Sequence, residues 1–99
     1  TTDTAAALRA NEIHAQALLL AKNIDGVYDS DPKKNPFAQK FDNITPKDYI
    51  EKGLSVMDTA AVALCSENGI PIIAFGLAEN DSIMRVLCGE KIGTYIVSK

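Results

Sequence analysis

The ten residues from Asn23 to Pro32, N-I-D-G-V-Y-D-S-D-P, concentrate side chains that could bind a ligand. They follow the apolar run 17–21, which is short enough and apolar enough to be a buried strand. A loop at the carboxyl end of a strand is where open α/β sheets bind their ligands. Tyr28 offers an aromatic face for stacking a base, and Asp31, held ahead of Pro32, offers a hydrogen-bond acceptor for ribose or amino groups.

The three carboxylates of this loop do not form a calcium site of the EF-hand type. That pattern needs ligands at alternate positions, then a glycine and a later glutamate, and the run D-S-D-P-K-K from Asp29 breaks it. Asp25 and Gly26 are also a strong turn signal, so the segment could simply reverse the chain. Binding loop and plain turn both remain open on the pattern alone.

A second polar cluster, Thr1, Thr2 and Asp3, precedes a helix predicted for residues 4–16. Its expected contact face is small and consists of Ala6, Ala10, Ile13 and Ala17. In the simplest interpretation Thr2 or Asp3 is the N-cap. Alternatively, the free amides of the first turn and two hydroxyls form a phosphate site. Asp3 would then act through a divalent cation such as magnesium, or accept a proton from the attacking group.

Composition and charge indicate one ordinary globular domain. The 99 residues are 46% apolar and 23% charged, with a net charge of -3. Only Lys33 and Lys34 are adjacent cations, so no basic stripe favours nucleic acid. No apolar run approaches the roughly 18 residues of a membrane span, and no leader peptide is evident, so a cytoplasmic protein without membrane contact is expected.

The remaining sulfur and imidazole groups have ordinary explanations. Cys65 and Cys88 are far apart in sequence and belong to no metal or redox motif, so both are expected to be plain thiols. His14 is expected in the last turn of the first helix, where it complements the helix dipole, or simply exposed.

Turn and cap signals divide the rest of the chain into short elements. We expect an exposed excursion at 33–40, a helix from Thr45-Pro46 to Gly53, a helix from Asp58 to Asn68-Gly69, a strand at 70–75, a helix at 83–88 opened by Asp81 or Ser82, and a strand at 94–97. This alternation predicts a parallel or mixed sheet with helices on both faces. Three strands are few, and the chain starts Thr-Thr-Asp instead of Met, so a fragment of a larger domain is expected.

Four segments carry a family resemblance: T-T-D-T-A-A-A-L-R-A-N-E-I at 1–13, I-D-G-V-Y-D-S-D-P at 24–32, E-K-G-L-S-V-M-D-T-A-A at 51–61 and I-P-I-I-A-F at 70–75. Along nearly its whole length the chain is similar to the C-terminal part of the bacterial uridylate kinases. The D-G-V-Y-x-x-D-P loop is shared across the wider amino acid kinase family. The V-M-D-x-x-A segment and the G-E-x-I-G-T pattern at 89–94 favour the uridylate kinases.

This resemblance implies that residues 1–99 are the ATP-binding C-terminal part of an amino acid kinase domain whose N-terminal part is absent. The implied fold is a three-layer α/β/α sandwich with a mainly parallel sheet. The implied reaction is transfer of the γ-phosphoryl group of ATP to UMP, which gives UDP and ADP in pyrimidine nucleotide biosynthesis. Magnesium, a homohexamer, activation by GTP and inhibition by UTP are implied with it.

By the same resemblance, Thr1 and Thr2 close the segment that binds the UMP phosphate. Asp3 is the catalytic acidic residue near the transferring group and its metal. ATP-binding positions fall on Lys22, Tyr28 and Asp31, with Asn23 as an alternative to Lys22. Asp58 also matches a family acid, although a role as helix N-cap is sufficient to explain it.

Several parts of the family's machinery are expected to be missing. The glycine-rich phosphate loop with its lysine, the uridine segment and most of the GTP-responsive region belong to the N-terminal half. Asp3 without cationic partners cannot stabilise a phosphoryl-transfer transition state, so the chain alone is predicted to be inactive but to retain weak nucleotide binding. Two alternatives stay open: another amino acid kinase acting on a carboxylate or carbamate, and a non-catalytic nucleotide-binding or oligomerisation module.

Overall fold

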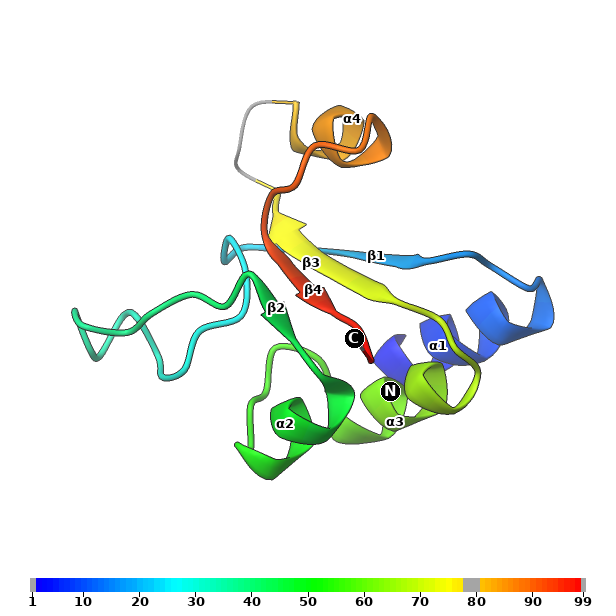
Figure 1. Cartoon of the computed structure of the whole chain (residues 1–99), viewed down its shortest axis with the longest axis horizontal. Coiled ribbons are helices and arrows are strands. Elements are labelled where there is room, and N and C mark those ends of the chain that lie inside the picture. The colour runs from blue at the N-terminus through cyan, green and yellow to red at the C-terminus, as the bar shows by residue number, and fades with distance from the viewer. Residues whose placement is uncertain (1, 78–80, 99) are drawn as a thin grey trace.

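One mixed sheet organises the protein, as the computed structural model of residues 2–77 and 81–98 shows (Figure 1). Its strand order is β1-β3-β4-β2, and the strands are β1 (Leu18–Lys22), β2 (Asn43–Ile44), β3 (Ile72–Gly76) and β4 (Thr94–Ile96). The pairs β1–β3 and β2–β4 are parallel, whereas β3 and β4 are antiparallel. The predicted mainly parallel sheet is therefore confirmed. Strand β2 was not foreseen, because two residues are too few to show an alternating pattern.

In residues 2–77 and 81–98, four helices accompany the sheet: α1 (Thr2–Glu12), α2 (Pro46–Glu51), α3 (Thr59–Glu67) and α4 (Ser82–Leu87). In Figure 1, α1, α2 and α3 lie below the sheet, and α4 lies above it beyond the end of β3. Helices thus flank the sheet on both sides, as expected, but most of them lie on one side. Within the described ranges, no helix has the length and apolar character needed to cross a membrane.

Local capping explains two of these helices. The Thr45 side chain accepts a hydrogen bond from the Asp48 amide at 3.1 Å, and Pro46 occupies the first turn of α2. Asp58 caps α3 by accepting from the Ala61 amide at 2.8 Å. Both predicted caps are confirmed. At α4 the predicted start is right, but Asp81 has a φ of 54° and its side chain makes no capping hydrogen bond.

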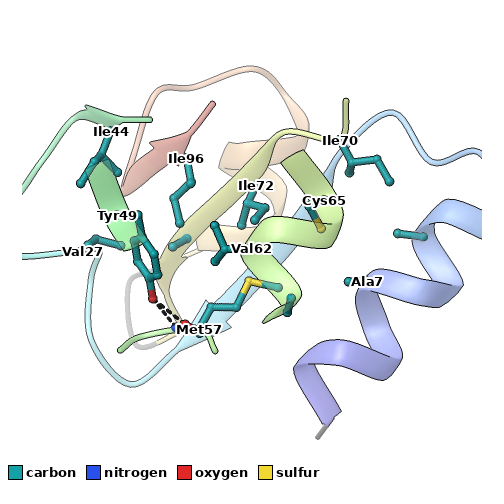
Figure 2. Packing of buried hydrophobic residues seen from close by; sticks show 13 residues of the cluster. Ala7, Val27, Ile44, Tyr49, Met57, Val62, Cys65, Ile70, Ile72 and Ile96 are labelled. Atoms are coloured by element: carbon teal, nitrogen blue, oxygen red, sulfur yellow. Dashed lines mark hydrogen bonds between the residues drawn. The ribbon is translucent and has the colours of Figure 1, made fainter. Parts of the chain in front are cut away.

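The main core lies between the sheet and the three helices below it (Figure 2). Its largest fully buried side chains include Tyr49, Met57, Val62, Ile72 and Ile96, which come from α2, the α2–α3 connection, α3, β3 and β4. Helix α1 packs against α3 through small residues, Ala7 and Ala10. Alanine on this face lets the two helices lie close to each other and to the sheet.

The predicted boundaries and face of the first helix were wrong. Helix α1 ends at Glu12, and His14 follows outside it with a φ of 55°, exposed to solvent. Ala7 is buried and Ala6 is exposed, and Ile13 is 58% exposed. The predicted face assumed that the helical period continued to residue 16. The chain leaves the helix one turn earlier. Of the predicted face only Ala10 is buried, and Ala7 completes the buried stripe.

Strand β1 is less buried than its apolar run predicts. It pairs with β3 along one edge, and among the described strands nothing pairs with its other edge. Leu19 is 37% exposed, while Leu18 and Leu20 pack against the core from the opposite side. An apolar run therefore marked the strand correctly, but its outer face and edge remain open in this chain.

Candidate nucleotide site

Two adjoining clefts open at the carboxyl end of β1. Their volumes are about 330 Å³ and about 550 Å³, which is the usual range for small-molecule sites. They share the lining residues Ile24, Asp31, Pro32 and Val56. The predicted binding loop 23–32 therefore forms one wall of a hollow large enough for a nucleotide-sized ligand.

Tyr28 is held in this wall by a neighbour in the same loop. Its hydroxyl donates a hydrogen bond of 2.7 Å to Asp25 Oδ1, and this bond is the main cause of a raised Tyr28 pKa. The phenol therefore stays protonated at neutral pH, and the carboxylate restrains the ring. Sequence reasoning treated Asp25 as a turn residue and missed its role as the partner of Tyr28.

Asp31 lines both clefts but also serves its own turn. Its Oδ1 accepts a hydrogen bond from the Lys33 amide at 2.9 Å, and its carbonyl accepts from the Lys34 and Asn35 amides. Such an Asx turn needs the carboxylate oriented toward the backbone after Pro32. Asp31 is thus fixed at the rim of the clefts, with a structural function in the loop that the sequence interpretation did not include.

The opposite wall comes from the connection between α2 and α3. Its lining residues are Lys52, Gly53, Leu54, Ser55 and Val56. This wall was not predicted, although the run 51–61 had been noted for its resemblance. Residues some 25 positions apart in the chain can form one cleft only through tertiary packing, and no local pattern marks them.

The second wall is anchored by Tyr49, which is completely buried. The Tyr49 hydroxyl donates to the Met57 carbonyl and accepts from the Met57 amide, both at 2.7 Å (Figure 2). Burial is the main cause of the raised Tyr49 pKa. One side chain thereby pairs both backbone groups of Met57 and fixes the segment between the cleft wall and α3.

Asp3, Lys22 and Asp58 meet where the amino ends of α1 and α3 approach the carboxyl end of β1. Asp3 Oδ2 accepts from the Asp58 amide at 3.1 Å, and Asp3 Oδ1 lies 4.0 Å from Lys22 Nζ. Thr4 Oγ1 is also within 3.4 Å of both Asp58 carboxylate oxygens. Asp3 was expected to lack cationic partners, but Lys22, which also lines the larger cleft, lies beside it.

The expected N-cap role of Thr2 and Asp3 was wrong, because α1 already begins at Thr2 and Asp3 lies in its first turn. A carboxylate there still complements the positive end of the helix dipole. The exposed Thr2 side chain lies at the same end. Thr1 lies outside the described residues. The assignment of Thr1 and Thr2 to the UMP phosphate stays a prediction.

The carboxylates near the clefts could hold magnesium only if a bound ligand supplied further oxygen atoms. Among the residues that the structure describes, no three His, Cys, Asp or Glu side chains gather closely enough to hold a metal ion. Magnesium in nucleotide sites is commonly held by one or two carboxylates plus phosphate oxygens and water. Asp3, partly exposed and next to Lys22, one of the lysines that line the clefts, is chemically suited to that arrangement.

These features define a class: an α/β protein with a ligand cleft at the carboxyl end of a parallel strand pair. Two helix amino termini and the neighbouring side chains of Lys22 and Asp3 lie next to this cleft. That combination suits a phosphorylated ligand. The model of a protein family described as the amino acid kinase family matches residues 1–76. The chain belongs to the amino acid kinase family.

Solved structures of UMP kinases resemble this chain closely. The UMP kinase of Bacillus anthracis superposes with a TM-score of 0.96 at 35% identity, over 100% of this chain and 41% of its own. The UMP kinase of Ureaplasma parvum gives 0.90 at 43% identity, over 98% of this chain and 42% of its own. The uridylate kinase of Archaeoglobus fulgidus gives 0.82 at 35% identity, with 98% and 47% covered. The chain therefore spans less than half the length of these enzymes.

Proposed function

We propose that this chain is the ATP-binding part of a UMP kinase, which transfers the γ-phosphoryl group of ATP to UMP to give UDP and ADP. The observation that carries the proposal is the cleft at the carboxyl end of β1, lined by Tyr28, Asp31 and Lys22, in a fold that superposes on a UMP kinase with a TM-score of 0.96. The pathway would be pyrimidine nucleotide synthesis in the cytoplasm.

The residues divide into two groups in this proposal. Tyr28, restrained by Asp25, stacks on the adenine, and Asp31 at the rim accepts hydrogen bonds from the nucleoside. Lys22 neutralises phosphate charge at the other end of the clefts. In this proposal the triphosphate lies next to the amino ends of α1 and α3, which favour negative charge.

Asp3 is the proposed catalytic carboxylate. Magnesium, held by Asp3 and the nucleotide phosphates, would neutralise the charge that spreads over the phosphoryl oxygens during transfer. The hydrogen bond from the Asp58 amide orients the Asp3 carboxylate, and Lys22 Nζ at 4.0 Å limits its repulsion of the phosphates. Thr1 and Thr2 remain the proposed contacts to the UMP phosphate.

The complete enzyme would supply what these 99 residues do not contain. We propose that the uridine-binding segment and a further phosphate-binding lysine come from an N-terminal portion, that the whole enzyme is a homohexamer, and that GTP activates it and UTP inhibits it. The chain by itself is expected to bind MgATP weakly and to have no appreciable kinase activity, because positioning of both substrates supplies most of the catalysis.

Two measurements test this proposal. Calorimetric titration of the chain with MgATP should show saturable binding that Tyr28→Ala weakens, whereas exposed Phe37→Ala, on the excursion outside the clefts, leaves it unchanged. For activity, the chain is mixed with the separately produced N-terminal portion of the Ureaplasma parvum enzyme, and ADP formation is assayed with UMP or aspartate. The two portions of that enzyme, mixed in the same way, are the positive control.

The outcomes separate the alternatives. ADP formation that requires UMP and disappears in Asp3→Asn supports the UMP kinase. Activity with aspartate instead would assign the chain to a kinase for carboxylates, an alternative for which the aspartate kinase of Synechocystis, 23% identical, shows only a shared fold. MgATP binding without any activity, while the control mixture is active, would indicate a non-catalytic nucleotide-binding module.

A further inference from the structure

Gly93 and Thr94 have no role in the site described so far, yet the Thr94 side chain reaches from β4 to the loop 23–32 that follows β1. Thr94 is fully buried on β4, opposite Ala74 of β3. Its hydroxyl accepts a hydrogen bond of 2.9 Å from the Val27 amide and donates to the Phe41 carbonyl. Val27 immediately precedes Tyr28, and Phe41 directly follows the excursion at 33–40.

Val27 and Phe41 face each other as two strands of a hairpin do. The Phe41 amide donates to the Val27 carbonyl at 2.8 Å, and the Asp29 amide donates to the Gln39 carbonyl at 3.0 Å. In a regular antiparallel pair the Val27 amide would donate directly to the Phe41 carbonyl. Here the Thr94 hydroxyl stands between those two groups and pairs both of them. One side chain therefore sets the separation of the two ends of the loop.

The surrounding glycines fit this arrangement closely. A Cβ on Gly26 would lie 2.8 Å from Thr94 Oγ1, so the absence of a side chain lets the loop approach the hydroxyl. A Cβ on Gly93, which has a φ of 74°, would lie 2.1 Å from the Ala74 carbonyl oxygen. Glycine at that position therefore lets β4 approach β3 and brings Thr94 to the loop.

We propose that Thr94 is a positioning residue for nucleotide binding: its hydroxyl clamps the Val27 amide and the Phe41 carbonyl and so holds Tyr28 at the wall of the cleft. This inference rests on the proposed function for its ligand, ATP, but not for the clamp itself. Without the hydroxyl, the buried Val27 amide and the partly buried Phe41 carbonyl lose this partner, and the loop must separate or admit water to satisfy them. Such loosening lowers affinity because binding must then order the loop again.

The test compares three variants by MgATP titration calorimetry and by amide hydrogen exchange at Val27. Thr94→Val keeps the size and removes the hydroxyl, and Thr94→Ser keeps the hydroxyl. Val62→Ala is the matched control, because the Val62 side chain is fully buried in the core and carries no hydrogen-bonding group. We expect Thr94→Val to raise the Kd for MgATP about tenfold and to accelerate exchange at Val27, while Thr94→Ser preserves both values. Val62→Ala should lower the Tm but leave the Kd for MgATP and the exchange rate at Val27 unchanged.

Each result decides the question. Unchanged Val27 exchange in Thr94→Val, or an affinity loss that Val62→Ala reproduces, would overturn the clamp. If the unmodified chain binds no MgATP, the proposed function fails. Amide hydrogen exchange at Val27 then tests the clamp independently of the ligand. Faster exchange in Thr94→Val but not in Thr94→Ser supports the clamp. If Thr94→Val does not fold, Gly26→Ala replaces it, since its Cβ pushes the loop off the hydroxyl. Faster exchange at Val27 in that variant supports the clamp, and unchanged exchange overturns it.

Discussion

Different kinds of interaction stabilise the core below the sheet and the loops around the clefts at the carboxyl end of β1. Apolar packing of Val62, Ile72, Ile96 and their neighbours holds the core. Hydrogen bonds of single buried or half-buried side chains hold the loops: Tyr49 and Tyr28 donate to Met57 and Asp25, and Thr94 accepts from the Val27 amide. Packing energy is spread over many contacts, whereas each loop depends on one or two directional bonds. Changes in the core should therefore lower stability, and changes in the loops should mainly alter the site.

The largest effect is expected where these two regions join, at Gly93. Gly93→Ala combines a positive φ with a Cβ placed 2.1 Å from the Ala74 carbonyl oxygen, so β3 and β4 must separate. The free energy of unfolding should fall by more than about 4 kcal/mol. Gly53→Ala is the matched control, because its φ is 66° but nothing lies within 4 Å of the added Cβ. It should cost only about 1 kcal/mol in urea unfolding. Equal losses in the two variants would contradict the close approach of the strands.

Ile72→Ala should give the next largest effect and define the core side of the comparison. Ile72 is 1% exposed, so truncation removes apolar contacts and leaves a cavity. We expect a loss of about 3 kcal/mol in urea unfolding, with the Kd for MgATP unchanged in the folded variant. A weakened Kd that parallels the lost stability would mean that the core and the loops are not separable.

Tyr49 belongs to both regions, because its ring packs in the core and its hydroxyl holds a loop. The effect of Tyr49→Phe should therefore be intermediate. The change keeps the ring but leaves the Met57 amide and carbonyl without their partner, which should cost about 2 kcal/mol. Circular dichroism during urea unfolding measures the loss. A loss as small as a surface substitution would show that Met57 finds other partners.

The same residue predicts a dependence on alkaline pH. Burial raises the Tyr49 pKa above its ordinary value of 10.0. The folded state then binds the phenolic proton more tightly than the unfolded state, so this contribution is present below pH 10 and is lost as pH rises through the folded pKa. Stability of the unmodified chain should therefore fall more steeply above pH 10 than that of Tyr49→Phe. Parallel curves would contradict the burial of the hydroxyl.

Tyr28→Phe should have the smallest effect on stability. The bond to Asp25 is partly exposed, so its loss should cost less than about 1 kcal/mol. The ring loses its restraint, however, and the Kd for MgATP should rise about threefold if Tyr28 stacks on adenine. Titration calorimetry of Tyr28→Phe against Tyr28→Ala measures this, with the larger loss expected for Tyr28→Ala.

Sequence reasoning located most elements because their signals are local. Thr45-Pro46 and Asp58 marked helix starts through hydrogen bonds that close within three residues. The apolar run at 70–75 marked β3, and the polar run after 17–21 marked the loop of the cleft. The prediction for the first helix was wrong at its C-terminal end, because alanines on several faces of a helix allow more than one contact stripe. Its true stripe depends on how α1 meets α3.

By itself, the sequence determined the caps, the approximate strand and helix positions, the loop that lines the clefts and the family. Only the tertiary structure showed the second wall at Lys52–Val56, the meeting of Asp3 with Lys22 and Asp58, and the reach of Thr94 to Val27. The physical reason is the range of the interactions involved. A cap or a turn is complete within a few residues, whereas these contacts join segments 19 to 67 positions apart and exist only after the sheet has assembled.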